Sequence, residues 1–150
     1  MKRKTVLATG AFDLLHYGHL SFLQEAKKAG GKNAKLIVIV ARDKTVESRK
    51  GKKPIVPEDQ RRALIEALKP VDDAILGFED MNHEAVIDKL KPDVIAVGYD
   101  QSDIKDSIEE VIERKGLKIQ VFQARRFAVD EIDSSSKIKR RVIELEKNNS

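Results

Sequence analysis

The chain has 150 residues, no cysteine and a formal net charge of +4, with 41% hydrophobic and 36% charged residues. The length suits a single domain with a sizeable core, and the lack of cysteine excludes a disulfide scaffold, a thiolate metal site and a cysteine nucleophile. No apolar run reaches the roughly 18 residues of a membrane span or resembles a signal peptide, so we expect a soluble, cytoplasmic protein with no membrane partner.

The first predicted strand, residues 5–9, leads into the segment 10–19, G-A-F-D-L-L-H-Y-G-H, and then into a predicted helix at residues 20–29. At a helix start the first backbone N–H groups lack intrahelical partners and the positive end of the helix dipole points outward, so an anion is favoured there. His16 and His19 add directed hydrogen-bond donors beside this start. The segment therefore predicts a phosphate site.

The histidine pair has two other interpretations, and both are weaker. As zinc ligands the two residues would leave a tetrahedral site short, because the third histidine of the chain, His83, belongs to a different helix; we therefore expect no metal site. One isolated histidine would be read as a core residue, but two that flank Gly18 at a strand-to-helix turn favour phosphate. The chain also has no G-x-G-x-x-G or G-x-x-x-x-G-K-[ST] motif, so neither a nicotinamide-type site nor a Walker loop is supported.

A continuous apolar run at residues 36–41 predicts a central parallel strand that is buried on both faces. We expect a basic loop after it, and residues 49–53, R-K-G-K-K, allow two interpretations. One is an ordinary solvated loop. The other is a mobile phosphate clamp, in which the flexible glycine lets Lys50 and Lys52 swing over a bound triphosphate.

The next predicted helix spans residues 58–68, between two prolines. Three apolar residues of this helix are expected to face the core: Ala63, Leu64 and Leu68. Arg61 or Arg62, in its first turns, could reach the same phosphates with a bidentate guanidinium, and the other arginine is expected to face solvent.

The rest of the chain continues the alternation of strands and helices. Strands are predicted at residues 74–77, 94–98 and 119–122, and helices at residues 84–90, 108–115 and from Ser134 onward. The final helix opens with three serines, which are typical N-caps, and residues 147–150 are expected to fray. The alternation indicates an α/β fold: a Rossmann-like, doubly wound five-stranded parallel sheet with helices on both faces, in one domain over residues 1–150.

Two segments resemble the cytidylyltransferase-like nucleotidyltransferases. Residues 10–19 are similar to the G-T-F-D-x-x-H-x-G-H signature of that family, and residues 134–138 resemble its C-terminal I-S-x-S-x-I helix start. Asp133 stands where the family prefers isoleucine, and Arg125 or Arg126 would have to substitute for an arginine often found before it. The two motifs lie at opposite ends of one domain, as they do in that family.

The resemblance implies a nucleotidyltransferase and a role for each matching residue. Four residues form the implied catalytic set, in which the histidines stabilise triphosphate charge and the lysines form the clamp: His16, His19, Lys50 and Lys52. The implied nucleotide-binding set is Gly10, Ala11, Phe12, Asp13, Gly18, Arg61, Gly98, Tyr99, Asp100, Gln101, Ser135, Ser136 and Arg141. Within it, residues 98–101 would form the wall of the base pocket, and the two serines with Arg141 would hold the β- and γ-phosphates.

Further segments are most similar to the archaeal FAD synthase branch of this family: residues 40–43, 51–55, 67–72, 74–77 and 100–101. This resemblance implies ATP and FMN as substrates, Mg²⁺ with the triphosphate and no tightly bound organic cofactor. A homodimer is a further expectation, because members of the family are often dimers. The alternative is a glycerol-3-phosphate cytidylyltransferase that uses CTP, or another sugar-phosphate nucleotidyltransferase, although the glycerol-phosphate enzymes tend to have an acidic pair followed by tryptophan where this chain has residues 99–101.

The chain offers no obvious strong base, and the implied reaction needs none. A phosphate monoester has a second pKa of about 6 and is largely a dianion near neutrality, so it can attack the α-phosphorus directly. The step requires in-line placement and stabilisation of the departing pyrophosphate, which histidines, lysines, a helix N-terminus and Mg²⁺ can supply. No covalent intermediate is expected.

Two interpretations from other functional classes also have to be tested. A nucleotide-binding domain without turnover would share the fold, although such a binder has no need of groups that stabilise departing pyrophosphate. An RNA-binding domain would depend steeply on salt, but five Phe, two Tyr and no Trp offer few stacking surfaces, so we expect no nucleic-acid partner. If the acceptor is FMN, Tyr99, Phe127 and Phe78 are candidates for stacking on its ring, or they are ordinary core and rim residues.

Overall fold

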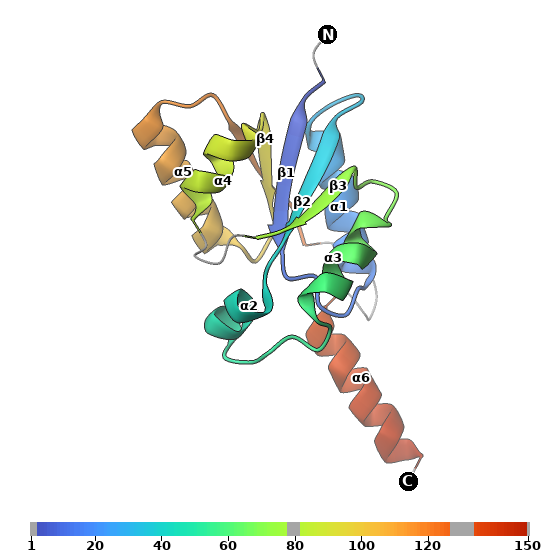
Figure 1. The fold of residues 1–150 in the computed structure, drawn as a ribbon. Helices are drawn as coiled ribbons and strands as arrows, with labels where there is room; N and C mark the ends of the chain where they lie inside the picture. Colours follow the sequence, from blue (N-terminus) through green and yellow to red (C-terminus); the bar gives the residue numbers. More distant parts are fainter. Residues whose placement is uncertain (1–2, 78–81, 127–133, 150) are drawn as a thin grey trace.

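The computed structural model describes residues 3–77, 82–126 and 134–149. Its strands are β1 (Thr5–Gly10), β2 (Lys35–Val40), β3 (Asp73–Leu76), β4 (Val94–Val97) and β5 (Gln120–Gln123). Its helices are α1 (Tyr17–Ala29), α2 (Asp43–Lys50), α3 (Glu58–Glu66), α4 (His83–Leu90), α5 (Ser102–Lys115) and α6 (Ser135–Asn148). Figure 1 shows the strands at the centre of the molecule, with helices to either side.

The five strands form one sheet in the order β3-β2-β1-β4-β5, and every pair of neighbours is parallel. The chain runs outward from β1 to β2 and β3, and then continues on the other side of β1 with β4 and β5. The direction of winding therefore reverses between β1 and β4. This confirms the predicted Rossmann-like fold, and such a switch point is where doubly wound sheets bind ligands, outside the carboxyl ends of the strands.

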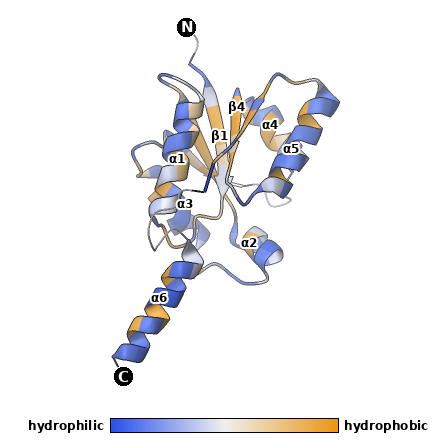
Figure 2. Ribbon diagram, turned by 180° about the vertical axis from the view of Figure 1, so that it is seen from behind, coloured by the Kyte–Doolittle hydropathy of each residue, from blue (hydrophilic) through white to orange (hydrophobic). Residues whose placement is uncertain are grey.

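Successive residues of the central strands pack on opposite faces of the sheet. In β1, Val6 and Ala8 belong to a core covered by α1 and α3, whereas Leu7 belongs to a second core covered by α4 and α5. Strand β4 is buried throughout, as is β2 after its first residue. Figure 2 shows these strands as a hydrophobic layer between the two helix layers. Burial on both faces explains why their sequences are continuous apolar runs.

The sequence pattern does not predict helix α2. We expected a basic loop after β2, whereas residues 43–50 form a helix that ends at Gly51, which has a φ of 74°. Only Thr45 and Val46 of this helix are buried, so its sequence carries no apolar stripe. Helix α5 likewise begins at Ser102, well before the expected start at residue 108.

The inward face of α3 also differs from the prediction. Ala63 and Leu64 are exposed, and the buried residues of this helix are Arg61 and Ile65. Arg61 and Ile65 are four residues apart and therefore share one face of the helix. Hydrophobicity alone would place Leu64 on the inner face. Arg61, which we expected to contact phosphates, is therefore in the protein interior.

Helix α6 extends away from the sheet (Figure 1), and no residue of it is buried. The hydroxyl of Ser134 accepts a hydrogen bond from the Lys137 N–H at 3.2 Å, which confirms the predicted serine cap. Within the described residues, no helix is both long enough and apolar enough to cross a membrane.

Candidate active site

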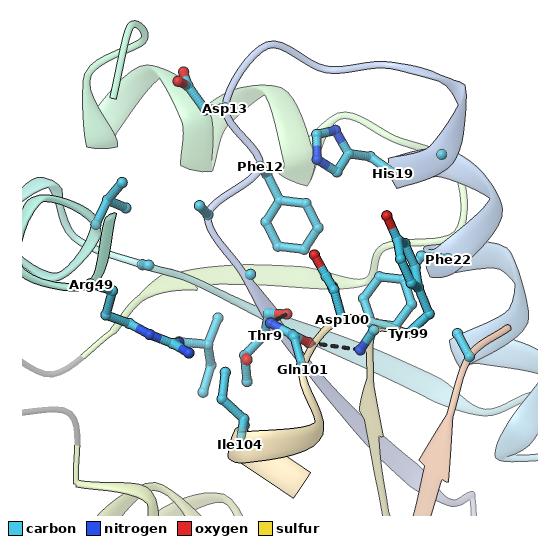
Figure 3. Close-up of a pocket in the computed structure, with 18 of the residues that line it drawn as sticks. Thr9, Phe12, Asp13, His19, Phe22, Arg49, Tyr99, Asp100, Gln101 and Ile104 are labelled. Carbon is cyan, nitrogen blue, oxygen red and sulfur yellow. Dashed lines mark hydrogen bonds between the residues drawn. The ribbon is translucent and has the colours of Figure 1, made fainter. Parts of the chain in front are cut away.

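A cavity of about 480 Å³ lies at the carboxyl ends of β1, β2 and β4, at the switch point of the sheet. Residues from the starts of α1 and α6, from α2 and from the α4 and α5 layer complete its walls. Figure 3 shows side chains from these segments converging on it, among them His19, Arg49, Tyr99 and Ile104. The fold thus brings together the two sequence motifs, which lie at opposite ends of the chain.

Most of the predicted site residues line this cavity. They are Gly10, Ala11, Phe12, Asp13, His16, Gly18, His19, Lys50, Gly98, Tyr99, Asp100, Gln101, Ser135 and Ser136. Lys52, Arg61 and Arg141 do not line it. Lys52 is exposed beyond the end of α2, and Arg141 is exposed in the middle of α6. Arg125 and Arg126, the possible substitutes for the family's arginine, do line the cavity.

The turn after β1 is built around Gly10 and Phe12. A Cβ atom on Gly10 would lie 2.8 Å from the Phe12 ring, so a larger residue does not fit without a shift. Phe12 and Leu14 have positive φ angles of 55° and 50°, a left-handed conformation that is uncommon for such side chains. The buried Phe12 ring meets the His19 ring edge-on, with 5.4 Å between their centroids. The left-handed backbone at Phe12 costs conformational energy, and in this conformation the Phe12 ring packs against His19.

Asp13 ties this turn to two distant segments. Its carboxylate accepts hydrogen bonds from the N–H groups of Ile55 and Val56, both at 2.9 Å. Its backbone carbonyl accepts a hydrogen bond from the Ser135 hydroxyl at 2.6 Å. The Asp13 side chain thus fixes the loop before α3, and Ser135 is the point at which α6 joins the site.

His16 and His19 form a stacked pair at the start of α1. Their ring centroids are 3.7 Å apart with 27° between the planes, and His19 Nδ1 accepts a hydrogen bond from the His16 N–H at 3.3 Å. Because Nδ1 is the acceptor, the neutral His19 ring carries its proton on Nε2. Burial, followed by the charges of His16 and Lys50, lowers the pKa of His19 to about 3, against an opposing effect of Asp13. His19 is therefore a neutral N–H donor at pH 7.

Two helices begin at the cavity. His16 is the N-cap of α1, and Ser134 is the N-cap of α6. The first N–H groups of each helix lack the usual intrahelical acceptor, and both helix dipoles place positive charge at these ends. Together with Lys50 at the end of α2, they make the cavity suitable for a polyanion.

Arg61 connects the turns behind the cavity, which corrects its predicted role as a phosphate contact. Its side chain is fully buried, and it donates hydrogen bonds to the carbonyls of Val56 at 2.8 Å and of Ala11 and Ala41 at 2.7 Å. Its Nη2 atom lies 2.6 Å from the Asp43 carboxylate. These partners take four of its five N–H donors and its side chain is fully buried, so Arg61 holds the turns after β1 and β2 in place and does not line the cavity.

Two consecutive basic residues, Arg49 and Lys50, end helix α2, and both line the cavity. Lys50 lies near the histidine pair, because its charge contributes to the lowered pKa of His19. Arg49 Nη2 is 2.9 Å from Oδ2 of Asp103, in the first turn of α5. Arg49 lines the cavity but is not among the residues that the sequence predicts for the site. It belongs to the basic run 49–53, of which only Lys50 and Lys52 were predicted to contact phosphates.

The turn after β4 is tied to β1. The Gly98 N–H donates a hydrogen bond to Gln101 Oε1 at 2.7 Å, the dashed line in Figure 3, and Gln101 Nε2 donates to the Thr9 carbonyl at 3.4 Å. A Cβ atom on Gly98 would lie 3.1 Å from Asp100 Oδ1. These contacts hold the wall of residues 98–101 against the end of β1.

Of the three aromatic candidates for flavin stacking, Tyr99 is the one that belongs to the described residues. Tyr99 is at the cavity rim, 45% exposed, with the Arg126 guanidinium carbon 5.7 Å from its ring centroid. Phe78 and Phe127 lie outside the described residues.

The donor set of the cavity suits a metal ion that arrives with a phosphate ligand. In the described parts of the chain, no group of three His, Cys, Asp or Glu side chains is placed to hold an ion. The Asp13 carboxylate beside the histidines already accepts two backbone N–H groups. An ion held mainly by phosphate oxygens and water, as Mg²⁺ commonly is, fits these residues.

Comparisons with known proteins agree with this geometry. The cytidylyltransferase-like family model matches residues 7–141. Two curated FAD synthases are similar to the chain: that of Methanothermobacter marburgensis is 46% identical over 95% of this chain and 88% of its own length, and that of Ferroglobus placidus is 49% identical over 95% and 90%.

Solved structures show the same fold. A lipopolysaccharide core biosynthesis protein from Thermoplasma volcanium has a TM-score of 0.71 and 37% identity, covering 84% of this chain and 99% of its own. A protein of unknown function from Archaeoglobus fulgidus has a TM-score of 0.64 at 18% identity, covering 86% and 96%, and shows the fold alone. The match to the family model, the fold and the paired histidines at a helix start agree: the chain belongs to the cytidylyltransferase-like family.

Proposed function

We propose that this chain is an FMN adenylyltransferase, which transfers AMP from ATP to FMN and produces FAD and pyrophosphate. The observation that carries the proposal is the stacked pair of His16 and His19 at the start of α1, in a cavity that also receives Lys50 and the start of α6. The FAD synthases that resemble the chain cover nearly all of it at 45–49% identity. Their similarity to the chain supports FMN as the acceptor.

The reaction is a single displacement at the α-phosphorus. An oxygen of the FMN phosphate forms the new P–O bond, and the bond between the α-phosphorus and the bridging oxygen to the β-phosphorus breaks. The FMN phosphate has a second pKa of about 6 and is largely a dianion near pH 7, so no protein base has to remove a proton. The protein's task is to place the two phosphates in line and to stabilise the pyrophosphate as it leaves.

The stabilising groups are those at the histidine end of the cavity. His19 offers its Nε2–H, Lys50 offers an ammonium group, and the first N–H groups of α1 and α6 face the same space. Ser135 and Ser136 at the start of α6 are proposed to contact the β- and γ-phosphates. A bound Mg²⁺ would neutralise charge on the phosphate oxygens.

The adenine base is proposed to lie beside residues 98–101. The Gly98 N–H is already bonded to Gln101 Oε1, and Gln101 is bonded to Thr9, so this wall is held in place before a ligand arrives. A rigid wall of main-chain atoms gives a base fixed hydrogen-bond partners without an ordering cost. Asp100 and Tyr99 then form the outer edge of the base site.

The proposal is tested by assaying pyrophosphate release with four substrate pairs: ATP or CTP, each with FMN or glycerol 3-phosphate. We expect release with ATP and FMN, together with FAD as the second product in equal amount. Release only with CTP and glycerol 3-phosphate would assign the chain to the cytidylyltransferases instead. Tight ATP binding without turnover of any pair would identify a nucleotide-binding domain, and RNA binding that weakens with salt and ignores ATP would identify an RNA-binding protein.

A further inference from the structure

The cavity has a second region, which the roles above leave unused. It lies between α2, α4 and α5, and we call it the α2-α4-α5 region. Its walls are aliphatic: Val46, Val86, Ile87, Ile104 and Ile108. Ile87, Ile104 and Ile108 are at most 4% exposed, so the region is lined by the second hydrophobic core of the protein. Such walls suit a flat apolar ring and do not suit a phosphate.

Polar groups stand at the edge of this region. Arg49 of α2 is paired with Asp103 of α5 at 2.9 Å. His83 of α4 is paired with Ser107 of α5, with 3.2 Å between Nδ1 and Oγ. Burial, followed by the charge of Arg49, lowers the pKa of His83, so its imidazole is neutral at pH 7 and can both donate and accept hydrogen bonds. Asp103 opposes this shift. The edge therefore offers an arginine that is ion-paired with an aspartate, and one neutral ring.

Arg49 and Lys50 face different ends of the cavity. Consecutive residues of a helix point about 100° apart. The charge of Lys50 acts on His19, whereas that of Arg49 acts on His83, and Figure 3 shows the Arg49 guanidinium extending toward Ile104. Helix α2 thus presents one cation to the triphosphate and a second cation to the aliphatic region.

The geometry of displacement indicates which substrate takes this region. In an in-line reaction the attacking oxygen approaches the α-phosphorus from the side opposite the departing pyrophosphate. The pyrophosphate is assigned to the histidines and the start of α6, and the base to residues 98–101. Two parts of the cavity then have no assigned ligand: the part lined by Phe22, Glu25, Arg125 and Arg126, which carries charged groups, and the aliphatic α2-α4-α5 region. The aliphatic walls favour the α2-α4-α5 region for an apolar ring, and the acceptor phosphate can reach the α-phosphorus from it.

We propose that the α2-α4-α5 region binds the isoalloxazine ring of FMN between its aliphatic walls, and that Arg49, positioned by Asp103, determines acceptor specificity by binding the polar edge of that ring. The inference rests on the proposed function. The ring has an apolar dimethylbenzene end and, at the other end, an edge with two carbonyls and one N–H. Arg49 donates to a carbonyl, and His83 can complement the rest of that edge. In this arrangement the faces of the ring contact aliphatic side chains.

The test uses the full chain with Arg49→Ala and with Val86→Trp, which fills the region from α4. Binding of FMN and of riboflavin, which has the ring but no phosphate, is followed by flavin fluorescence, and KM is measured separately for FMN and ATP. We expect each variant to weaken both flavins by about tenfold or more, the effect of losing a charged hydrogen bond or of blocking the pocket, while the KM for ATP changes less than about twofold. Arg114→Ala is the matched control, since Arg114 pairs with Glu84 across α4 and α5 but does not line the cavity.

Three results would overturn the inference. A raised KM for ATP with unchanged flavin binding would place the base in this region. Weaker FMN binding with unchanged riboflavin binding in Arg49→Ala would make Arg49 a phosphate contact. Unchanged flavin binding in both variants would leave the region outside the acceptor site. If wild-type protein forms FAD in any of these cases, the proposed function stands and only the acceptor pocket is wrong, whereas no FAD from the wild type refutes the proposed function itself.

Discussion

The His19 ring is a neutral hydrogen-bond donor that lies near the positively charged Lys50. Its Nδ1 is held by the His16 N–H, and its pKa is lowered to about 3 by burial, by His16 and by Lys50. A neutral donor costs less to bury than an imidazolium, and it still stabilises an oxyanion. The negative charge that develops on the departing pyrophosphate favours the protonated ring, so the donor strengthens as the reaction proceeds.

The proposed role of His16 and His19 in the transition state predicts different effects on kcat and on the Kd for ATP. His16→Ala and His19→Ala are each expected to lower kcat by about 10²–10³, the scale of one lost oxyanion donor, with a much smaller change in the Kd for ATP. Steady-state kinetics and equilibrium ATP binding measure the two quantities on protein whose fold is checked by circular dichroism. Loss of the folded state in either variant would show that the pair belongs to the core instead.

The lowered pKa of His19 also predicts how stability depends on pH. The unfolded chain binds a proton at about 6.5 and the folded chain at about 3, so between these values the unfolded state holds more protons. Acidification from pH 6.5 toward pH 3 should therefore destabilise the fold, by up to about 1.4 kcal/mol per pH unit from this group. His83, whose pKa is also lowered, acts in the same direction.

Urea unfolding at a series of pH values below 7 measures this dependence in the wild type, His19→Gln and His83→Gln. Each variant should lose part of the pH slope that the wild type shows. If His19→Gln keeps the whole slope, burial does not lower the pKa of His19 in the folded chain.

Which residues line the cavity could be predicted where the informative residues are contiguous, and not where they are scattered. The histidines were found because their motif and the helix start lie within ten residues. Arg61 and Arg62 are adjacent and identical in sequence terms, yet Arg61 is fully buried and the Arg62 side chain is 33% exposed. The partners that bury Arg61 come from the turns after β1 and β2 and from residues before α3, and no local pattern reveals them.

Helix α2 shows why sequence periodicity can fail to predict a helix. Its first N–H, of Asp43, donates to the Glu58 carboxylate of α3 at 2.9 Å, and Arg42 donates to the Gly77 carbonyl at 2.6 Å. Its capping partners are therefore distant in sequence, and it buries only two of its residues. Helices such as α1, which bury an apolar stripe of their own, were predicted with small errors at their ends.

Lys50 and Lys52 belong to the same basic run in the sequence, but the end of α2 places them differently. Lys50 is the last residue of the helix and lines the cavity, whereas Lys52 follows the Gly51 turn and does not. We expect Lys50→Ala to lower kcat/KM by about 10–100-fold, and Lys52→Ala to change it by less than about threefold, since a hydrogen bond to a charged group contributes about 1.5–3 kcal/mol. Kinetics of the two variants under identical conditions measure this. Equal losses would favour a mobile clamp that uses both lysines.

For the whole molecule, the sheet and its layers followed from the alternation of apolar strands and helices, which a parallel sheet buried on both faces requires. The predicted final helix is confirmed as α6, which contains the apolar residues Ile138, Val142, Ile143 and Leu145. The sequence pattern does not indicate that the last three are about half exposed, where α6 projects from the body (Figures 1 and 2).

The homodimer that the family resemblance suggests stays a prediction. We propose that two copies of the chain would associate through α6. The first half of α6 is basic, with Lys137, Lys139, Arg140 and Arg141, and its second half contains Glu144 and Glu146. Two copies packed antiparallel through Val142 and Leu145 would place opposite charges against each other and cover the apolar stripe. Sedimentation should give twice the mass of one chain, and the double change Val142→Glu with Leu145→Glu should give a monomer. A wild-type monomer at every concentration tested would contradict this.

Direct transfer of AMP from ATP to FMN in one in-line step has a stereochemical consequence at the α-phosphorus. The most direct test is to supply one diastereomer of ATP with sulfur at the α-phosphorus, together with FMN, and to determine the configuration at the corresponding phosphorus of the FAD analogue. One displacement inverts that configuration, so we expect inversion. Retention would require two displacements through a covalent adenylyl-enzyme and would contradict it.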